Sequence, residues 1–116
     1  MITITEETLR SKDIGKYVSR VKNNSLVYDA LKRKTTRTFA IKNDNKIIGI
    51  TITYPLDNGT LAIAVSCDRF SLNKELYIKG LDKMREIIDE YGIPFNIKTE
   101  RKGWERFLRR MFYRVN

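Results

Sequence analysis

The sequence contains no histidine and only one cysteine, Cys67, among its 116 residues. A histidine general base and a zinc site built on imidazoles or several thiolates are therefore excluded, and an internal disulfide cannot form. No apolar run reaches the roughly 20 residues that a helix needs to cross a bilayer, and no secretory leader is recognisable. We therefore expect a cytoplasmic protein with no metal ion and no contact with a membrane.

Glycine is missing where an α/β protein most often needs it. Between Gly59 and Gly80 lies the stretch AVSCDRFSLNKELYIKGLDKM, residues 64–84, whose pattern is typical of a strand followed directly by a long helix. Such junctions commonly hold phosphate-bearing cofactors on a glycine-rich loop, because backbone N–H groups at the helix N-terminus must approach the phosphate closely. The stretch thus has the position of a cofactor site but not its glycines.

Acidic residues are too few to balance the basic ones, and the net charge is +9. Residues 1–37 hold nine Lys and Arg against four Asp and Glu, and residues 98–116 hold seven against two. Residues 38–97 hold seven against eight, so the excess lies at the two ends of the chain. Basic surfaces attract nucleic acids or acidic proteins, although a lysine-rich surface also serves plain solvation.

The spacing of apolar residues predicts an α+β fold in a single domain over residues 1–116. The expected elements are a strand at 2–5, helical stretches at 8–21 and 26–34, an antiparallel three-stranded meander at 36–66, a helix at 76–91, a strand at 94–100 and a helix at 101–112. Because a helix that connects two strands of one sheet by a crossover makes them parallel, we expect a mixed sheet.

Two apolar patterns lead to predictions about faces. In the middle strand of the meander, glycine and threonine alternate with Ile48, Ile50, Ile52 and Tyr54. This alternation predicts one apolar face on a core and one weakly polar face. The second helical stretch is expected to bury one face made of Leu26, Val27, Ala30 and Leu31.

The order of these elements resembles that of the GNAT family of N-acetyltransferases over most of the chain. The matching segments are NKIIGITITY as the central hairpin strand, LAIAVSCD as the strand before the cofactor junction, LDKMREIIDEYGIPFNIKT as helix and crossover strand, and GWERFLRRMFYRV as closing segment. The resemblance implies a GNAT-like, mixed, mostly antiparallel twisted sheet flanked by helices.

The junction departs from the pattern of active GNAT members. Their Arg/Gln-x-x-Gly-x-Gly/Ala loop holds the pyrophosphate of acetyl-CoA on backbone N–H groups. Here the loop is CDRFSLNKELY, so the resemblance implies a degenerate cofactor junction made of Asp68, Arg69, Ser71 and Asn73. Phe112 stands where the closing segment of the family has a glycine, and Leu108 where many members place a general-acid tyrosine. We therefore expect no catalytic residue and no bound cofactor.

A second resemblance is to degenerate GNAT-like proteins of tailed bacteriophages, including an internal virion protein of podoviruses. Val65, Ser66 and Asp68 match their V-S/T-x-D junction, and the run RFL at 106–108 matches their closing helix. This resemblance implies a phage-encoded protein, in the host cytoplasm or in the virion, that kept the fold and lost the transferase chemistry.

Two groups of basic residues are expected to contact a partner, since guanidinium groups bind carboxylates and phosphates through paired hydrogen bonds. They are Lys32, Arg33, Lys34 and Arg37, and Lys98, Arg101, Lys102, Arg106, Arg109, Arg110 and Arg114. The sequence therefore favours a non-catalytic protein that binds a virion or host protein through basic surfaces. Two alternatives stay open. One is a small N-acetyltransferase that uses acetyl-CoA through an atypical loop. The other is a nucleic-acid-binding module, although the sequence has no helix-turn-helix, zinc-finger or RNA-recognition signature.

Overall fold

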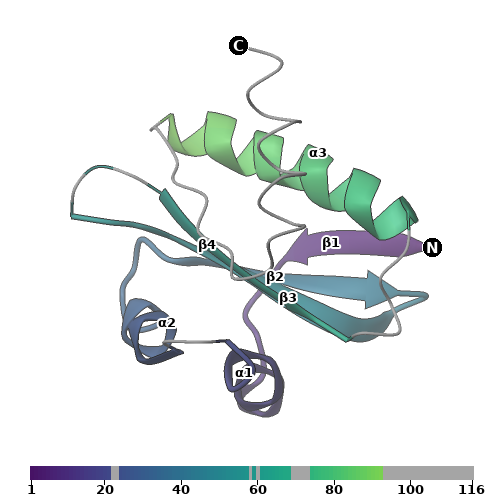
Figure 1. The fold of residues 1–116 in the computed structure, drawn as a ribbon, viewed down its shortest axis with the longest axis horizontal. Coiled ribbons are helices and arrows are strands. Elements are labelled where there is room, and N and C mark those ends of the chain that lie inside the picture. Colours follow the sequence, from purple (N-terminus) through teal and green to yellow (C-terminus); the bar gives the residue numbers. More distant parts are fainter. Residues whose placement is uncertain (22–23, 58, 60, 69–73, 93–116) are drawn as a thin grey trace.

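A four-stranded antiparallel sheet lies between two layers of helix in the computed structural model of the chain (Figure 1). The structure describes residues 1–21, 24–57, 59, 61–68 and 74–92. In chain order the elements are β1 (Ile2–Glu6), α1 (Ser11–Val18), α2 (Asn24–Ala30), β2 (Arg37–Asn43), β3 (Lys46–Pro55), β4 (Leu61–Cys67) and α3 (Lys74–Tyr91). Helices α1 and α2 cover one face of the sheet and α3 covers the other. The predicted strand at 94–100 and helix at 101–112, and with them the parallel pair of a mixed sheet, lie outside the described residues.

The meander predicted from the sequence is confirmed, with the strands side by side in the order β1-β2-β3-β4. The turn between β2 and β3 is made by Asp44 and Asn45, whose φ angles are 50° and 71°. A two-residue hairpin turn needs positive φ at both positions, and these residue types tolerate it better than others. In the connection from β3 to β4, Gly59 has a φ of 82°.

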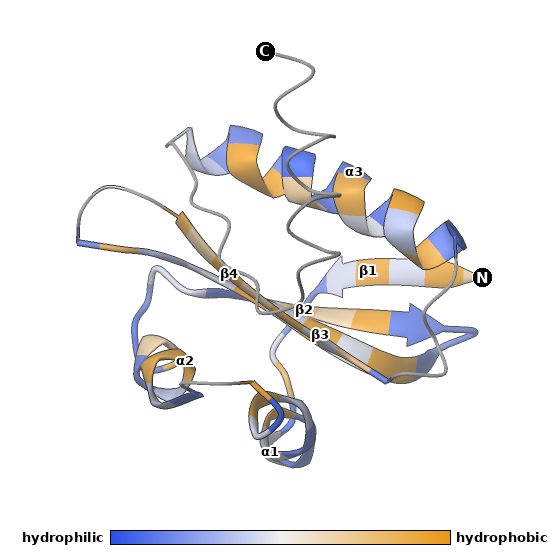
Figure 2. Cartoon of the chain, in the orientation of Figure 1, coloured by the Kyte–Doolittle hydropathy of each residue, from blue (hydrophilic) through white to orange (hydrophobic). Residues whose placement is uncertain are grey.

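Both faces of β3 are buried, so the expectation that only one face lies on a core is wrong. Ile50 and Ile52 pack toward α1 and α2, whereas Thr51 and Thr53 alternate to the other face and are only 6% and 0% exposed. Thr53 is accommodated there because its hydroxyl shares a hydrogen bond of 3.2 Å with the phenol of Tyr91 on α3. Figure 2 shows hydrophobic residues along β4, and hydrophobic residues alternating with near-neutral ones along β3.

A shift of register interrupts the alternation near the start of β3. Ile41 of β2 lies opposite Gly49, but Lys42 lies opposite Ile47, so Ile48 is an extra residue in its strand. Such a bulge turns the following side chains to the opposite face. Ile48 therefore packs in the cluster on the α3 face, and the prediction that it shares a face with the next isoleucines is wrong.

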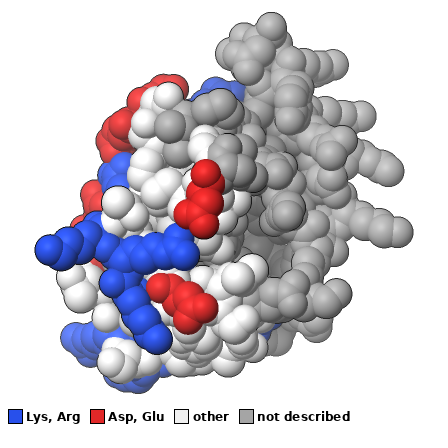
Figure 3. Space-filling view, turned by 90° about the vertical axis from the view of Figure 1, so that its left-hand side faces the viewer, with Lys and Arg blue, Asp and Glu red and all other residues white. Residues whose placement is uncertain are grey.

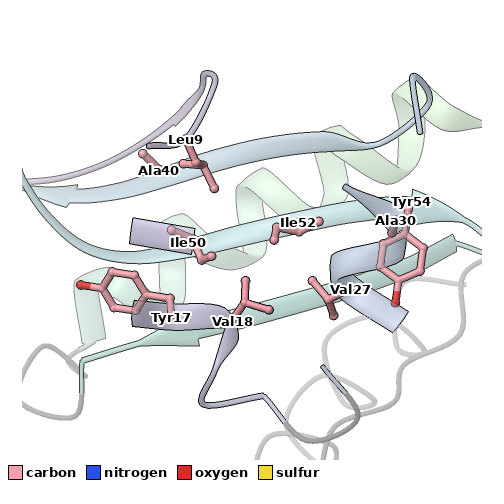
Figure 4. Packing of buried hydrophobic residues seen from close by; sticks show 9 residues of the cluster. All are labelled: Leu9, Tyr17, Val18, Val27, Ala30, Ala40, Ile50, Ile52 and Tyr54. Atoms are coloured by element: carbon pink, nitrogen blue, oxygen red, sulfur yellow. The ribbon is translucent and has the colours of Figure 1, made fainter. Parts of the chain in front are cut away.

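The core between the sheet and the α1–α2 layer is drawn in Figure 4. Its buried residues are Leu9, Tyr17, Val18, Val27, Ala30, Ala40, Ile50, Ile52 and Tyr54. Leu26 is not among them, because α2 is short and turns only Val27 and Ala30 toward the sheet. With 62% of its surface exposed, Leu26 contradicts the prediction that it is buried.

The helix predicted at 76–91 is confirmed as α3, which begins two residues earlier. Its buried side chains are Leu76, Leu81, Met84 and Ile87. The helix ends at Gly92, whose φ is 65° and whose N–H donates to the Ile88 carbonyl at 3.0 Å. A glycine in this left-handed conformation is a common helix stop, since it has no Cβ to clash. Among the described helices, none is long and apolar enough to cross a membrane.

Candidate binding site at the end of strand β4

The strand-to-helix junction predicted from the sequence begins where β4 ends. The Asp68 N–H donates to the Ile48 carbonyl at 2.8 Å, so pairing with β3 continues one residue beyond the strand. Residues 69–73 lie outside the described part of the chain, and α3 begins at Lys74. Of the predicted junction residues, the structure therefore describes Asp68, whereas Arg69, Ser71 and Asn73 lie outside it.

β4 approaches β3 unusually closely at the pair formed by Gly49 and Cys67. A Cβ atom at position 49 would lie 2.7 Å from the Cys67 sulfur and 2.7 Å from the Ser66 carbonyl oxygen. Any side chain there would have to push the end of β4 away. A lone glycine inside a strand is the sequence signal for such an approach, and the role of Gly49 is found only in the structure.

The Asp68 carboxylate is held by three side chains from α1 and the turn that follows it. Arg20 donates from Nη1 to Oδ1 at 2.9 Å, and the Tyr17 hydroxyl donates to Oδ2 at 3.1 Å. The Lys16 ammonium lies 3.9 Å from Oδ2. Lys16 and Arg20 also lie over the Tyr17 ring, at 5.0 and 5.2 Å from its centre. This cluster ties α1 to the end of β4 and neutralises the negative charge that the sequence places at the junction.

The cluster shifts the pKa values of two of its members. Burial acts to raise the pKa of Asp68, but hydrogen bonds from Arg20 and Tyr17 and the nearby positive charges outweigh it, so the pKa lies below its ordinary value of 3.8. Burial, followed by the hydrogen bond to Asp68, raises the pKa of Tyr17 to about 12. At neutral pH the Tyr17 hydroxyl is therefore a donor, and Asp68 is a stabilised anion. A carboxylate with a lowered pKa is a poor general base.

Replacing Asp68 by asparagine is expected to lower the free energy of unfolding by about 1 kcal/mol near neutral pH, since charged hydrogen bonds at a partly exposed site are lost. The pKa of Asp68 is lower in the folded protein than in the unfolded chain. The stabilisation that Asp68 provides is therefore complete above the unfolded pKa of about 3.9, and it is lost as the pH falls through the folded-state pKa. Urea unfolding at several pH values measures the difference between the two proteins. It should stay constant between about pH 7 and 5 and shrink below about pH 4.

Asp57 supplies the control for this experiment, because it is exposed and forms no ion pair with any residue in the described ranges. Asp57→Asn should leave the free energy of unfolding within about 0.5 kcal/mol of wild type at every pH. A destabilisation by Asp68→Asn that persisted unchanged in strong acid would show that the ion pairs are not its cause.

Arg37, one of the predicted contact residues, is engaged within the fold. Its guanidinium donates to both carboxylate oxygens of Glu6, at 2.7 and 3.0 Å, and pairs with Glu90 of α3. It also lies over the rings of Phe39 and Tyr91, at 5.3 and 5.5 Å from their centres. The hydrogen bond to Glu6 is the main reason that the pKa of Arg37 is raised still further above its ordinary value. Two carboxylates thus already neutralise this cation.

Lys32, Arg33 and Lys34 follow α2 and are all exposed. None of the three forms an ion pair with an acidic residue of the described part of the chain. Figure 3 views the left-hand side of Figure 1, where α2 lies, and Lys and Arg side chains group in the left part of this view with acidic side chains beside them. The other predicted contact residues, from Lys98 to Arg114, lie outside the described residues.

The two helical layers differ in charge. Between residues 10 and 34 the described chain has seven basic residues and two acidic ones, a balance of +5. Helix α3 has four basic residues and five acidic ones, a balance of −1. The basic excess of the described chain therefore lies on the α1–α2 side of the sheet.

The described residues do not provide a metal site: no group of three or more potential ligands lies close together among them. Cys67 packs against the cluster that contains Ile48 and Leu76, as expected of a small residue at a strand end. Asp68 is paired with side chains of α1 and the turn after it, so the described end of β4 holds α1 in place. Because Asp68 is a stabilised anion and Tyr17 is protonated, neither is suited to proton abstraction.

No protein-family model matches the chain, and no curated protein matches it. Solved structures do. A GNAT family acetyltransferase from Elizabethkingia anophelis, with acetyl-CoA bound, superposes with a TM-score of 0.73 at 16% identity over 99% of this chain and 84% of its own. The chain has the GNAT fold. The resemblance to the GNAT fold and the predicted α+β class are thereby confirmed, whereas the resemblance to phage proteins stays a prediction.

Two further structures share the GNAT fold with this chain. A ribosomal-protein-alanine N-acetyltransferase from Brucella melitensis biovar Abortus 2308 gives a TM-score of 0.61 at 12% identity, over 99% of this chain and 90% of its own. A transcriptional regulator from Bacillus halodurans C-125 superposes with a TM-score of 0.62 at 14% identity, over 97% of this chain and 92% of its own. At these low sequence identities, the likeness shows that the architecture of the chain is acetyltransferase-like. Bound acetyl-CoA is observed in the Elizabethkingia protein.

Proposed function

We propose that the chain is a non-catalytic GNAT-fold protein that binds an acidic protein partner through its basic surfaces. The observation that supports this most is the separation of charge between the two helical layers, which leaves exposed cations on the α1–α2 side. Within that layer Arg20 and Lys16 are used to hold Asp68, whereas Lys32, Arg33 and Lys34 have no acidic partner in the described chain. Such a surface attracts and orients acidic partners. The phage resemblance makes a virion component or a host protein the expected partner.

The sequence of the junction does not favour catalysis. Residues 68–74 contain no glycine, so backbone N–H groups lack the freedom with which GNAT members surround a pyrophosphate. Asp68 brings a negative charge to the end of β4, and its lowered pKa makes it a weak base. In the described part of the chain the junction stabilises the fold, and the cations that remain are those of a binding surface.

A small N-acetyltransferase is the second candidate, and it is favoured by one observation. The Elizabethkingia structure, which contains acetyl-CoA, covers 99% of this chain. In this alternative the atypical loop that contains Ser71 and Asn73 would bind the pyrophosphate through its N–H groups and hydroxyl, and acetyl-CoA would supply the acyl group. The two candidates make opposite predictions for acetyl-CoA binding.

We expect acetyl-CoA to give no heat in calorimetry and no shift of the melting temperature. A ligand with a Kd of about 10 μM would stabilise the folded chain by about 2.7 kcal/mol at a concentration 100 times higher, which a thermal-shift assay detects easily. Micromolar binding that is weakened by Ser71→Ala or Asn73→Ala, but not by the matched exposed-serine variant Ser25→Ala, would overturn the non-catalytic proposal in favour of the transferase.

A further inference from the structure

The donors around the Asp68 carboxylate are arranged as they would be around a bound anion. Arg20 Nη1 lies 2.9 Å from one carboxylate oxygen, and the Tyr17 hydroxyl and the Lys16 ammonium lie 3.1 and 3.9 Å from the other. Guanidinium and ammonium groups, together with hydroxyl donors, are the groups with which proteins bind phosphates and carboxylates. Here the anion that they hold is a side chain of the protein itself.

Tyr17 keeps these donors in place independently of Asp68. Tyr17 is only 1% exposed and packs in the core between α1 and the sheet, and its hydroxyl is also 3.4 Å from the Ile47 carbonyl. Lys16 and Arg20 lie over the Tyr17 ring, at 5.0 and 5.2 Å from its centre, and the face of an aromatic ring attracts positive charge. A buried ring therefore supports the positions of both cations, which do not depend on the carboxylate alone.

The Asp68 carboxylate can leave these donors without any change in the sheet. The Asp68 N–H donates to the Ile48 carbonyl at 2.8 Å, so the backbone is held by β3 while the side-chain torsions remain free to rotate. The side chain of Asp68 is 28% exposed, and those of Lys16 and Arg20 are 50% and 46% exposed. Water therefore reaches the cluster, and rotation of one side chain opens it to a dissolved anion.

The charges of the cluster balance only while an anion lies between the cations. Asp13, one turn before Tyr17 on α1, is the other carboxylate whose charge acts on the Tyr17 hydroxyl. With Asp68 in place, two cations face two carboxylates. When Asp68 rotates away, Lys16 and Arg20 remain with Asp13 alone, which leaves a balance of +1.

We propose that Lys16, Tyr17 and Arg20 form a binding site for a phosphate group, and that Asp68 is a built-in occupant that blocks it. A dissolved carboxylate has no more charge than Asp68, which is attached to the chain at the site and is therefore favoured in competition. A phosphate group carries a charge of about −1.5 to −2 at neutral pH and has three terminal oxygens, one for each donor. Phosphate is therefore the class of anion best suited to replace Asp68.

The test is a phosphorus NMR titration of inorganic phosphate, with the ionic strength held constant by sodium chloride. Asp68→Ala removes the occupant, and the Kd for phosphate should fall at least tenfold relative to wild type, which is about 1.4 kcal/mol. Asp68→Asn removes the charge but keeps the shape, so it should give a smaller gain, and it replaces the alanine variant if that variant does not fold. Phosphate should also raise the melting temperature of Asp68→Ala more than acetate does at the same concentration.

A second substitution locates the site. Asp68→Ala/Arg20→Gln should lose the gain, whereas Asp68→Ala/Arg33→Gln should keep it, because Arg33 is exposed and forms no ion pair within the described part of the chain. Equal phosphate affinities of wild type and both Asp68 variants would overturn the proposal. Loss of the gain with Arg33→Gln, but not with Arg20→Gln, would overturn the location.

An effect of acetate as large as that of phosphate would overturn the class of ligand. The cations of this site are not those assigned to a protein partner, so each of these results leaves the proposed function to its own test, the acetyl-CoA titration.

Discussion

Replacing Phe39 by alanine is expected to lower the free energy of unfolding by about 3–5 kcal/mol, the usual cost of removing a fully buried aromatic side chain. Phe39 is 0% exposed and packs with Leu61 of β4 and Ile87 of α3. Arg37 and Lys83 lie over its ring, at 5.3 and 5.9 Å from the centre. The ring therefore joins the sheet to α3, and alanine would leave a cavity that neither layer can close.

Urea unfolding followed by circular dichroism measures this loss. Val65 provides the control, because it is also a strand residue on the α3 face but is 41% exposed. Val65→Ala should cost no more than about 1 kcal/mol, since little apolar surface is transferred to water. Similar losses in the two variants would contradict the packing described for Phe39.

The second large effect is expected at Gly49. Alanine at this position would place its Cβ 2.7 Å from the Cys67 sulfur and 2.7 Å from the Ser66 carbonyl oxygen. A flexible side chain could move aside, but the backbone oxygen cannot do so without displacing β4. We expect Gly49→Ala to cost about 2–3 kcal/mol, the upper part of the range for overpacking. Adding Cys67→Ala should restore only part of this loss, because the contact with Ser66 remains.

Gly80→Ala is expected to give the opposite result. Gly80 lies within α3, and a Cβ there would meet no atom within 4 Å. Gly80→Ala should therefore stabilise the protein by about 0.5–1 kcal/mol through helix propensity. The melting temperatures of the two glycine variants should move in opposite directions. A Gly49→Ala protein as stable as wild type would show that the close approach at the end of β4 is not real.

The Gly49 contact also bears on the candidate site. The end of β4 is pressed against β3 by this glycine and tied to α1 through Asp68, and both contacts stabilise the edge at which GNAT enzymes bind acetyl-CoA. The described end of β4 is held by Asp68, and the sequence that follows it, residues 69–73, contains no glycine, which agrees with the proposed role in binding. The acetyl-CoA titration decides this directly.

Local signals in the sequence were sufficient for the hairpin and the long helix. The turn between β2 and β3 follows from the cluster of turn-forming residues at 43–45, and α3 follows from apolar residues at three- and four-residue spacing ended by Gly92. These features depend on neighbours within a few residues, so no tertiary information is needed to predict them. The order of elements was likewise enough to indicate the GNAT architecture.

The candidate site could not be predicted from local patterns, because it is built from contacts between residues far apart in the chain. Arg20 and Asp68 are 48 residues apart, and Arg37 and Glu6 are 31 apart, so no local pattern shows that these charges neutralise each other. The same holds for Ile48, whose face depends on a register shift against β2, and for Leu26, whose exposure depends on how the short helix α2 meets the sheet.

By itself, the sequence determined the α+β class, the excess of positive charge and the missing glycines of the cofactor junction, because composition and short-range spacing are independent of packing. Only the tertiary structure decided which charges remain for a partner. It pairs Lys16, Arg20 and Arg37 with carboxylates from distant elements and leaves Lys32, Arg33 and Lys34, after α2, exposed. Electrostatic interactions depend on distance in space, and that distance is set by the fold.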